Sequence, residues 1–366
     1  MADLRRYARQ IALPEFGAAG QERLRSGSVL IVGAGGLGSP AALYLAAAGV
    51  GRIGLVDFDL VDVTNLQRQV IYGMPDVGRP KLEAASGRLR ALNPDVHLDL
   101  HAEPFGAANA RALVTAYDVV VDGTDNFPTR YLVNDACVMT RTPNVYGSVS
   151  RFEGQASVFA APGGPCYRCL HPEPPADGLI LSCAEGGVLG VLPGLIGMVQ
   201  ATEVIKLLTG LGEPLVGRFL LYDALRMRFR EIGLARDPDC PVCGDRPTIR
   251  DLVEYARTCE TGEMSHEPAI DMTIDDLKKW QAEGHSHVLV DVREPGEHAI
   301  GAIEGAVLIP LGQLGARVDE LPKDQAIVAY CQGGGRSARA VAMLRAKGFD
   351  AHNLVGGFRA WQAAED

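Results

Sequence analysis

The stretch VLIVGAGGLGSPAALYLAAAG, residues 29–49, decides the fold of the first part of the chain. An apolar run typical of a buried strand is followed by Gly33, Gly35 and Gly38, and then by a helical pattern. Glycines at this spacing let a backbone approach a phosphate, and the start of the helix presents free N–H groups to it. The stretch predicts a nucleotide-binding strand–loop–helix unit, although the same glycines would also permit tight strand–helix packing alone.

Outward from this unit, residues 28–125 alternate short apolar runs with helical patterns. SVLIV, RIGLVD and YDVVVD are predicted strands, and SPAALYLAAAG and RPKLEAASGRLRAL are predicted crossover helices. Such alternation favours an α/β fold, a Rossmann-like domain whose mainly parallel sheet is covered on both faces. Residues 147–232 add glycine-rich turns and one long helix, predicted over 195–208.

A charged stretch without apolar periodicity, residues 245–268, predicts a domain boundary. We expect a first domain over residues 1–245, a linker over 246–268, and a small α/β domain over 269–366. The strands predicted for the small domain are HVLVDV, VLIP and AIVAYC.

The bulk composition is that of a globular protein: 366 residues, 47% hydrophobic and 22% charged. The net charge of −10 argues against nucleic acid or an anionic membrane as a partner. The start of the chain does not read as a signal peptide, and the apolar stretch 188–199 is too short to span a bilayer. We therefore expect a cytoplasmic protein, in which paired cysteines bind metal or do redox work.

Charged residues downstream of the glycine loop fit a nucleoside triphosphate. Asp57 ends the second strand, where a carboxylate can accept hydrogen bonds from a ribose. Arg68 and Lys81 are cations suited to phosphates, and Asp125 is a carboxylate suited to Mg²⁺. A nicotinamide oxidoreductase is the rival interpretation, but it has no need of the segments TNLQRQ and DGTDN.

Together with RRYARQ at residues 5–10, these motifs resemble the MoeB/ThiF branch of the ubiquitin-activating-enzyme-like family, over about residues 4–245. The resemblance implies adenylation, with ATP and Mg²⁺, of small sulfur carrier proteins that end in Gly-Gly. It implies a homodimer in which Arg9 is lent to the ATP site of the partner. The residues it assigns to ATP and Mg²⁺ within the chain are Gly36, Asp57, Thr64, Asn65, Leu66, Gln67, Arg68, Lys81, Asp125 and Asn126.

Two CxxC pairs predict a metal site. Cys166 and Cys169 form the first pair, and Cys240 and Cys243 form the second, about 70 residues later. Two such loops can complete a tetrahedral zinc site, and four protein ligands leave no position open for substrate. We therefore expect a structural zinc ion, as the family resemblance also implies.

Another cysteine, Cys183, follows a stretch rich in proline and glycine. It is either a small buried residue or, as the resemblance implies, a residue that forms a thioester or disulfide-linked intermediate with the carrier. Cys137 and Cys259 belong to no such motif, and we expect both to be structural.

The segment YCQGGGRS, residues 330–337, places Cys331 at the head of a bare loop before a helical pattern. Backbone N–H groups of such a loop, with Arg336 beside them, favour a thiolate or a persulfide. Residues 269–366 resemble a rhodanese domain, which implies that Cys331 accepts sulfur from a persulfide or thiosulfate donor. Phosphatases of the tyrosine type have a similar loop, but theirs is one residue longer than the four residues between Cys331 and Arg336.

The combined expectation is an adenylyltransferase and sulfurtransferase. Its carrier, of the MoaD or ThiS type, would be activated by ATP and then receive sulfur from Cys331, most simply for molybdopterin synthesis. Thiamin, cysteine and tRNA thiolation use similar carriers and stay open. Three rival functions each fit part of the pattern: a ubiquitin-like activator that uses a Cys183 thioester, a nicotinamide oxidoreductase and an inert scaffold.

Overall fold

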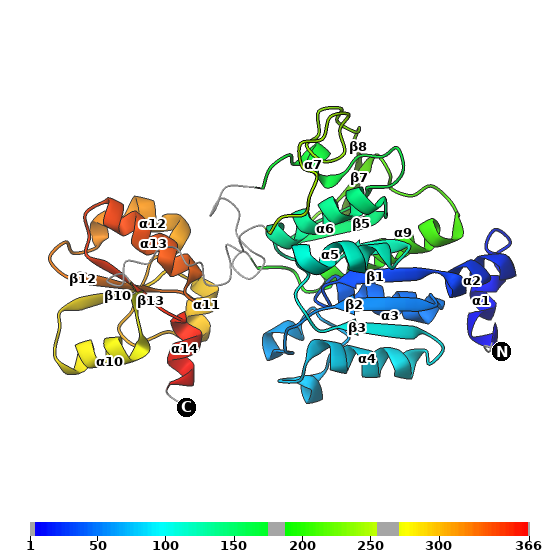
Figure 1. Ribbon diagram of the computed structural model, residues 1–366. Helices are drawn as coiled ribbons and strands as arrows, with labels where there is room; N and C mark the ends of the chain where they lie inside the picture. Colours follow the sequence, from blue (N-terminus) through cyan, green and yellow to red (C-terminus); the bar gives the residue numbers. More distant parts are fainter. Residues whose placement is uncertain (1–3, 175–186, 255–270, 365–366) are drawn as a thin grey trace. The chain divides into compact units, whose positions relative to one another are not determined.

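The computed structural model describes residues 4–174, 187–254 and 271–364. The chain divides into two compact units, residues 1–256 and 257–366 (Figure 1). Each unit has its own sheet and its own hydrophobic cores.

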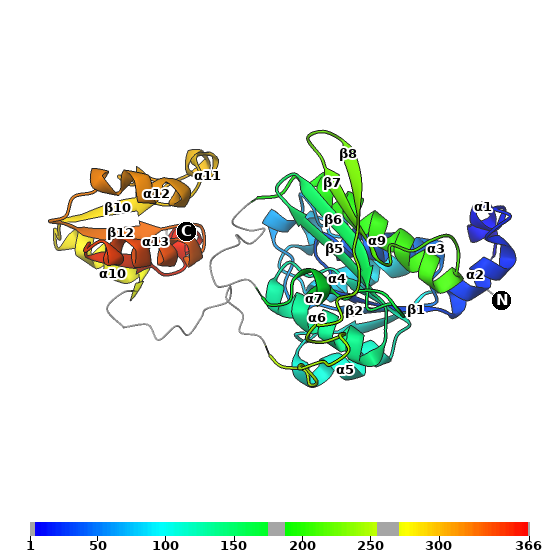
Figure 2. The same ribbon diagram turned by 90° about the horizontal axis from the view of Figure 1, so that it is seen from above.

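The larger unit contains an eight-stranded sheet in the order β3-β2-β1-β4-β5-β6-β7-β8. Strands β3 to β5 pair in parallel, and β5 to β8 pair antiparallel, so the predicted parallel sheet is extended by a meander (Figure 2). The strands are β1 Ser28–Val32, β2 Arg52–Val56, β3 His97–His101, β4 Val119–Asp122, β5 Asn144–Ser150, β6 Glu153–Phe159, β7 Arg218–Asp223 and β8 Arg228–Gly233.

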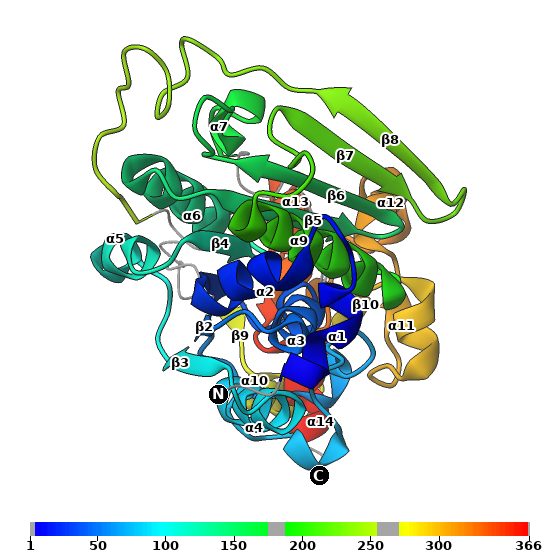
Figure 3. The same ribbon diagram turned by 90° about the vertical axis from the view of Figure 1, so that its right-hand side faces the viewer.

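Helices cover both faces of this sheet (Figure 3). The α-helices are α1 Ala8–Ile11, α2 Gly17–Ser26, α3 Gly38–Ala48, α4 Lys81–Leu92, α5 Ala107–Thr115, α6 Phe127–Thr140, α7 Tyr167–Leu170 and α9 Val191–Thr209. Short 3-10 turns occur at η1 Leu4–Tyr7, η2 Val63–Asn65 and η3 Met74–Asp76. Alternate residues of β1 face opposite ways: Val29 and Ile31 pack with α3, α4 and α9, and Leu30 and Val32 pack with α5 and α6.

The strand order reverses beside β1, because β2 follows on one side and β4 lies on the other. In open parallel sheets, ligands bind beyond the carboxyl ends of the strands at this switch point. Gly33 follows β1 there and Gly123 follows β4. The fold therefore places the glycine loop where a nucleotide site is expected.

Among the described residues, one helix, α9, is long and apolar enough to cross a membrane (19 residues, mean hydropathy 1.5). It begins at Val191 rather than at the predicted Leu195, because the first turn tolerates Pro193. Two of its polar side chains are buried and hydrogen-bonded: Gln200 donates to the carbonyl oxygen of Asp122 at 2.8 Å, and Glu203 accepts from the N–H of Leu215 at 2.8 Å. It packs as a core helix of this unit.

The smaller unit has a five-stranded parallel sheet in the order β11-β10-β12-β13-β9. Helices α12 and α13 lie over one core, and α10 and α14 lie over the other. The strands are β9 Asp271–Met272, β10 His287–Asp291, β11 Val307–Leu308, β12 Ala326–Tyr330 and β13 Ala351–Leu354. The helices are α10 Ile274–Ala282, α11 Pro295–Ile300, α12 Leu311–Arg317, η4 Val318–Glu320, α13 Gly335–Ala346 and α14 Gly357–Ala363.

Candidate functional site

Two glycines of the loop after β1 are required by backbone packing. Gly33 has a φ of 94°, and a Cβ there would lie 2.8 Å from the carbonyl oxygen of Gly123. A Cβ on Gly38 would overlap the carbonyl oxygen of Gly33. Packing alone therefore explains Gly33 and Gly38, since the loops after β1 and β4 touch at this point.

The other glycines of the loop are less crowded. The atom nearest to a Cβ on Gly35 would be Nε2 of Gln69, at an ordinary contact distance of 3.6 Å. A Cβ on Gly36 would lie 3.1 Å from Pro193 and 3.7 Å from Cγ of Arg68. The bare backbone on this side of the loop, beside a guanidinium-bearing side chain, is a place where a phosphate can approach.

Asp57 ties the loop to the end of β2. Its carboxylate accepts from the N–H groups of Ala34 at 2.8 Å and Asp59 at 2.9 Å. Burial raises the pKa of Asp57 in spite of Lys81, whose Nζ lies 3.9 Å from this carboxylate and 2.7 Å from that of Asp59. The fold thus brings Asp57 and Lys81 together beside the glycine loop, with Lys81 almost fully buried.

The predicted nucleotide-lining residues 64–68 form η2 and the turn after it. Asp62 caps this turn by accepting from the N–H of Thr64 at 2.8 Å, and Arg68 donates to the carbonyl oxygen of Thr64 at 3.1 Å. Oε1 of the next residue, Gln69, is buried and accepts no hydrogen bond. Arg68 reaches Gly36, as the contact above shows, so this segment borders the glycine loop.

The predicted Mg²⁺ ligand, Asp125, lies exposed after β4. Its neighbour Asn126 caps α6, since Oδ1 accepts from the N–H of Thr129 at 3.0 Å. Asp122 is buried behind this turn with Arg130, 3.8 Å from it, and burial raises the pKa of Asp122. The Asn126 side chain therefore has a structural contact of its own, and the Asp125 carboxylate is open to solvent.

Arg9 does not lie in the nucleotide site of its own chain. It is exposed on α1, and the neighbouring Gln10 donates to the carbonyl oxygen of Ala48 at the last residue of α3. Gly36 lies two residues before the start of that helix. Arg9 and the glycine loop are therefore at opposite ends of α3.

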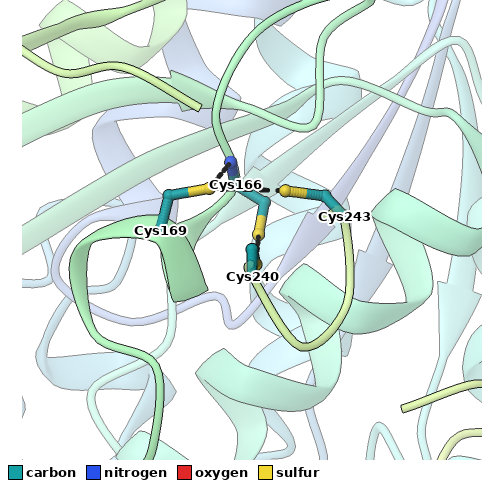
Figure 4. Close-up of side chains that lie close together, drawn as sticks. All are labelled: Cys166, Cys169, Cys240 and Cys243. Atoms are coloured by element: carbon teal, nitrogen blue, oxygen red, sulfur yellow. Dashed lines mark hydrogen bonds between the residues drawn. The ribbon is translucent and has the colours of Figure 1, made fainter. Parts of the chain in front are cut away.

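The four paired cysteines converge from segments far apart in the chain (Figure 4). All four sulfur atoms lie within 4.8 Å of one another. Cys166 and Cys240 are 3.5 Å apart, and Cys169 and Cys243 are 3.3 Å apart. A tetrahedral ion with Zn–S bonds of about 2.3 Å needs sulfur–sulfur edges of about 3.8 Å, so the cluster fits one metal ion. The backbone N–H of Cys166 donates to Sγ of Cys169 at 3.4 Å.

The cysteine cluster is fixed to α6 by the two residues between Cys166 and Cys169. The N–H of Tyr167 donates to Oδ1 of Asn134 at 2.7 Å. Arg168 donates to both carboxylate oxygens of Asp135 at 2.8 Å each, and both side chains are 2% exposed. The cysteine cluster and the helix that follows Asp125 are therefore joined by a buried ion pair.

In the smaller unit, Cys331 directly follows β12 and is buried at the start of the glycine loop. Its Sγ accepts from the N–H of Gly334 at 3.1 Å, and Oγ of Ser337 lies 3.6 Å away. Gly334 has a φ of 102°, which suits glycine. The loop leads directly into α13, so the sulfur lies beside the start of a helix, where negative charge is stabilised.

Arg336, expected beside the sulfur, is paired with a carboxylate that we did not predict. Its two terminal nitrogens donate to Glu297 on α11, at 2.6 and 2.7 Å. Arg293 is buried against Asp291, and it also donates to Oε1 of Gln332, next to Cys331, at 3.2 Å. Both guanidinium groups hold the loop while paired with carboxylates.

Cys183 and Cys259 lie outside the described residues. Cys137 is buried in α6, and burial raises its pKa well above the ordinary value, in keeping with a structural role. Sequence reasoning missed Glu297 and Asp135. Each is an ordinary acidic residue without a motif around it, and only the fold shows which arginine it contacts.

The two units match two known families. The ThiF family matches residues 7–242, and the rhodanese-like domain matches residues 273–364. The chain belongs to the ThiF family. It carries a C-terminal rhodanese domain, so the resemblance drawn from the motifs is confirmed.

Two of the relatives match this chain over nearly its whole length, and a third matches its larger part. A Mycobacterium tuberculosis protein named probable adenylyltransferase/sulfurtransferase MoeZ is 48% identical over 369 positions, covering 98% of this chain and 93% of the relative. The adenylyltransferase and sulfurtransferase MOCS3 of Sus scrofa is 43% identical, covering 100% of this chain and 86% of the relative. A Thermus thermophilus sulfur carrier protein adenylyltransferase is 53% identical over 70% of this chain and 97% of its own length.

Among solved structures, Escherichia coli MccB in complex with MccA-N7isoASN is similar, with a TM-score of 0.60 and 22% identity. The match covers 66% of this chain and 75% of that one. At this identity the likeness supports the fold alone. The enzyme names come from the full-length relatives, and they agree with the two chemistries that the motifs indicated.

Proposed function

We propose that the protein adenylates the C-terminal carboxylate of a small sulfur carrier ending in Gly-Gly, and then converts it to a thiocarboxylate. One observation carries the proposal: a single chain combines the glycine loop, with Asp57 and Lys81 beside it, and a rhodanese loop headed by Cys331. Relatives that match nearly the whole chain are named for both activities.

In the first step, the carrier carboxylate attacks the α-phosphorus of ATP, and pyrophosphate leaves. Arg68 and Lys81 would stabilise the charge that builds on the phosphate oxygens, and Asp57 would accept from the ribose. Asp125 would hold Mg²⁺, which neutralises phosphate charge when bound. Thr64, Asn65, Leu66, Gln67 and Asn126 would line this site, and Arg9 would complete the site of the partner subunit in a homodimer.

In the second step, a Cys331 persulfide attacks the activated carbonyl carbon, and AMP leaves. The product is an acyl disulfide between the carrier and Cys331. A Cys183 thiolate would then attack the Cys331 sulfur, which releases the carrier thiocarboxylate and leaves a Cys183–Cys331 disulfide. An external dithiol would reduce this disulfide to restore both thiols.

The cysteine cluster and the pathway of the carrier complete the proposal. Zn²⁺ bound by the four cysteines would be structural, because four protein ligands leave no open position. The carrier would serve molybdopterin cofactor synthesis in the cytoplasm; thiamin, cysteine or tRNA thiolation would use the same chemistry.

The experiment separates the two steps. Carrier-dependent exchange of pyrophosphate into ATP should persist in Cys331→Ala and be lost in Asp125→Ala. Asp95→Ala is the matched control, because Asp95 is also exposed but precedes β3, at the amino ends of the strands. Exchange that persists in Asp125→Ala at the wild-type rate would remove the role of Asp125. Absence of exchange in the wild-type protein with every carrier tested would remove the adenylation proposal.

A further inference from the structure

Glu297 on α11 pairs with Arg336, which lies in the first turn of α13, five residues after Cys331. The carboxylate takes both terminal nitrogens of Arg336, at 2.6 and 2.7 Å, and also accepts from the N–H of Glu294 at 3.0 Å. The Arg336 side chain is 6% exposed and that of Glu297 is 32% exposed. A bidentate pair of this kind is held in one geometry and carries no net charge.

The second guanidinium at the loop is neutralised in the same way. Arg293 is 1% exposed and donates to both oxygens of the buried Asp291, which also binds Nδ1 of His298 at 2.9 Å. Arg293 touches the loop itself through Gln332. Each of these two arginines thus has its own carboxylate, and the sulfur is stabilised locally by the N–H of Gly334 and the start of α13.

The pairing of both arginines with carboxylates affects which sulfur donor the Cys331 loop favours. A donor such as thiosulfate carries two negative charges and releases sulfite, so a flanking arginine without a carboxylate would favour it. An arginine that is already paired with a carboxylate gives little stabilisation to the second negative charge of thiosulfate. A donor whose leaving group is a cysteine thiolate carries less charge and therefore needs less stabilisation from the arginine.

We propose that Glu297 is a specificity-determining residue: by pairing with Arg336, it makes the Cys331 loop favour donors of low charge, such as a cysteine persulfide on a protein, over dianionic thiosulfate. This inference rests on the sulfur transfer proposed above. The lowered pKa of Glu297 agrees with it: burial acts to raise this pKa, but the hydrogen bonds from Arg336 and from the N–H of Glu294, together with the nearby arginine charges, outweigh burial and keep the carboxylate ionised.

Two donors of matched chemistry isolate the effect of charge. The Cys331 thiolate attacks the outer sulfur of thiosulfate, giving the persulfide and sulfite. It attacks the corresponding sulfur of methanethiosulfonate, giving the same persulfide and methanesulfinate. The first donor carries two negative charges and the second carries one. Cyanide then removes the outer sulfur as thiocyanate and restores the thiolate, so both donors are measured by one product.

The experiment compares the ratio of kcat/KM for thiosulfate to kcat/KM for methanethiosulfonate in the full chain. Glu297→Gln keeps the shape of the side chain and removes its charge, and it should raise this ratio on the order of tenfold, the effect of one charged hydrogen bond. Arg336→Gln leaves the carboxylate without its cation and should lower the ratio. Glu320→Gln is the matched control, because Glu320 forms the same bidentate pair with Arg317 on the surface of this unit.

The outcomes are distinct. A ratio that rises in Glu297→Gln, falls in Arg336→Gln and is unchanged in Glu320→Gln supports the inference. Equal losses with both donors in Glu297→Gln would make Glu297 merely structural and overturn it. If Glu297→Gln does not fold, the Arg336→Gln ratio decides alone, and an unchanged or raised ratio there overturns the inference. If wild-type protein and Cys331→Ser both transfer no sulfur from either donor, the proposed sulfur transfer itself fails.

Discussion

The buried pair between Arg168 and Asp135 should be among the costliest contacts of the larger unit to break. Arg168→Met leaves the Asp135 carboxylate in the interior without its cation, and both side chains are only 2% exposed. Removing one partner of a buried ion pair destabilises a protein by about 3–5 kcal/mol. In a unit of this size, that loss lowers Tm by roughly 10 °C.

A double-mutant cycle separates the interaction energy of the ion pair from the cost of removing each side chain. Asp135→Leu alone should cost about as much as Arg168→Met, since it leaves the guanidinium buried. The combined variant removes both charges, so its cost should fall well below the sum of the two single costs. Arg25→Met is the control, because Arg25 pairs with Glu22 on the surface, where both side chains are more than half exposed. That change should cost less than about 1 kcal/mol.

The assay can follow each unit separately. The chain has two tryptophans, Trp280 and Trp361, and both lie in the smaller unit. Their fluorescence reports unfolding of that unit, whereas far-UV circular dichroism reports both. Metal content is measured for each variant, because Arg168 lies between two of the four cysteines. A cost of Arg168→Met below about 1 kcal/mol, or additive costs in the double variant, would refute the reasoning.

Two further predictions test other parts of the structure. Gly38→Ala should unfold the larger unit or abolish its soluble expression, because the added Cβ overlaps the carbonyl oxygen of Gly33. Gly194→Ala, where nothing lies within 4 Å of the added carbon, should leave Tm equal or higher. The stability of the smaller unit should depend on acid. Burial acts to raise the pKa values of Asp291 and Glu297, but their hydrogen bonds and the nearby arginine charges together outweigh burial, so both pKa values are lowered. The contribution of these two carboxylates to the stability of the folded unit is complete above their pKa values in the unfolded chain, about 4. It is lost as the pH falls through their lower pKa values in the folded unit. Tryptophan fluorescence during urea unfolding at several pH values measures this loss of stability. Glu297→Gln should reduce the dependence of the unfolding free energy on pH. An unchanged dependence would contradict the contribution assigned to Glu297.

The sequence predicts those features of the site that depend on local spacing. Gly33 and Gly38 follow an apolar run and open a helix, so their place in the fold follows from the residues around them. The two CxxC pairs likewise predict one cluster, because each short loop directs its two thiols toward the same point.

Contacts made by single charged residues could not be predicted in this way. Asp135 and Glu297 have no motif, and their partners Arg168 and Arg336 are distant in the chain. The carboxylate that pairs with Arg336 could not be predicted, because nothing in the segment around Arg336 indicates it. Only the packing of α11 against the Cys331 loop brings that carboxylate within reach.

We propose that one chain performs both nucleotide-dependent activation and sulfur delivery, and the mass of the carrier tests this most directly. The protein is incubated with ATP, Mg²⁺, a protein persulfide donor and a carrier ending in Gly-Gly, and the carrier is then weighed by mass spectrometry. Wild-type protein should replace one carboxylate oxygen with sulfur, and Cys331→Ser should form the carrier adenylate without this replacement. Thiocarboxylate formed by Cys331→Ser at the wild-type rate would contradict the account.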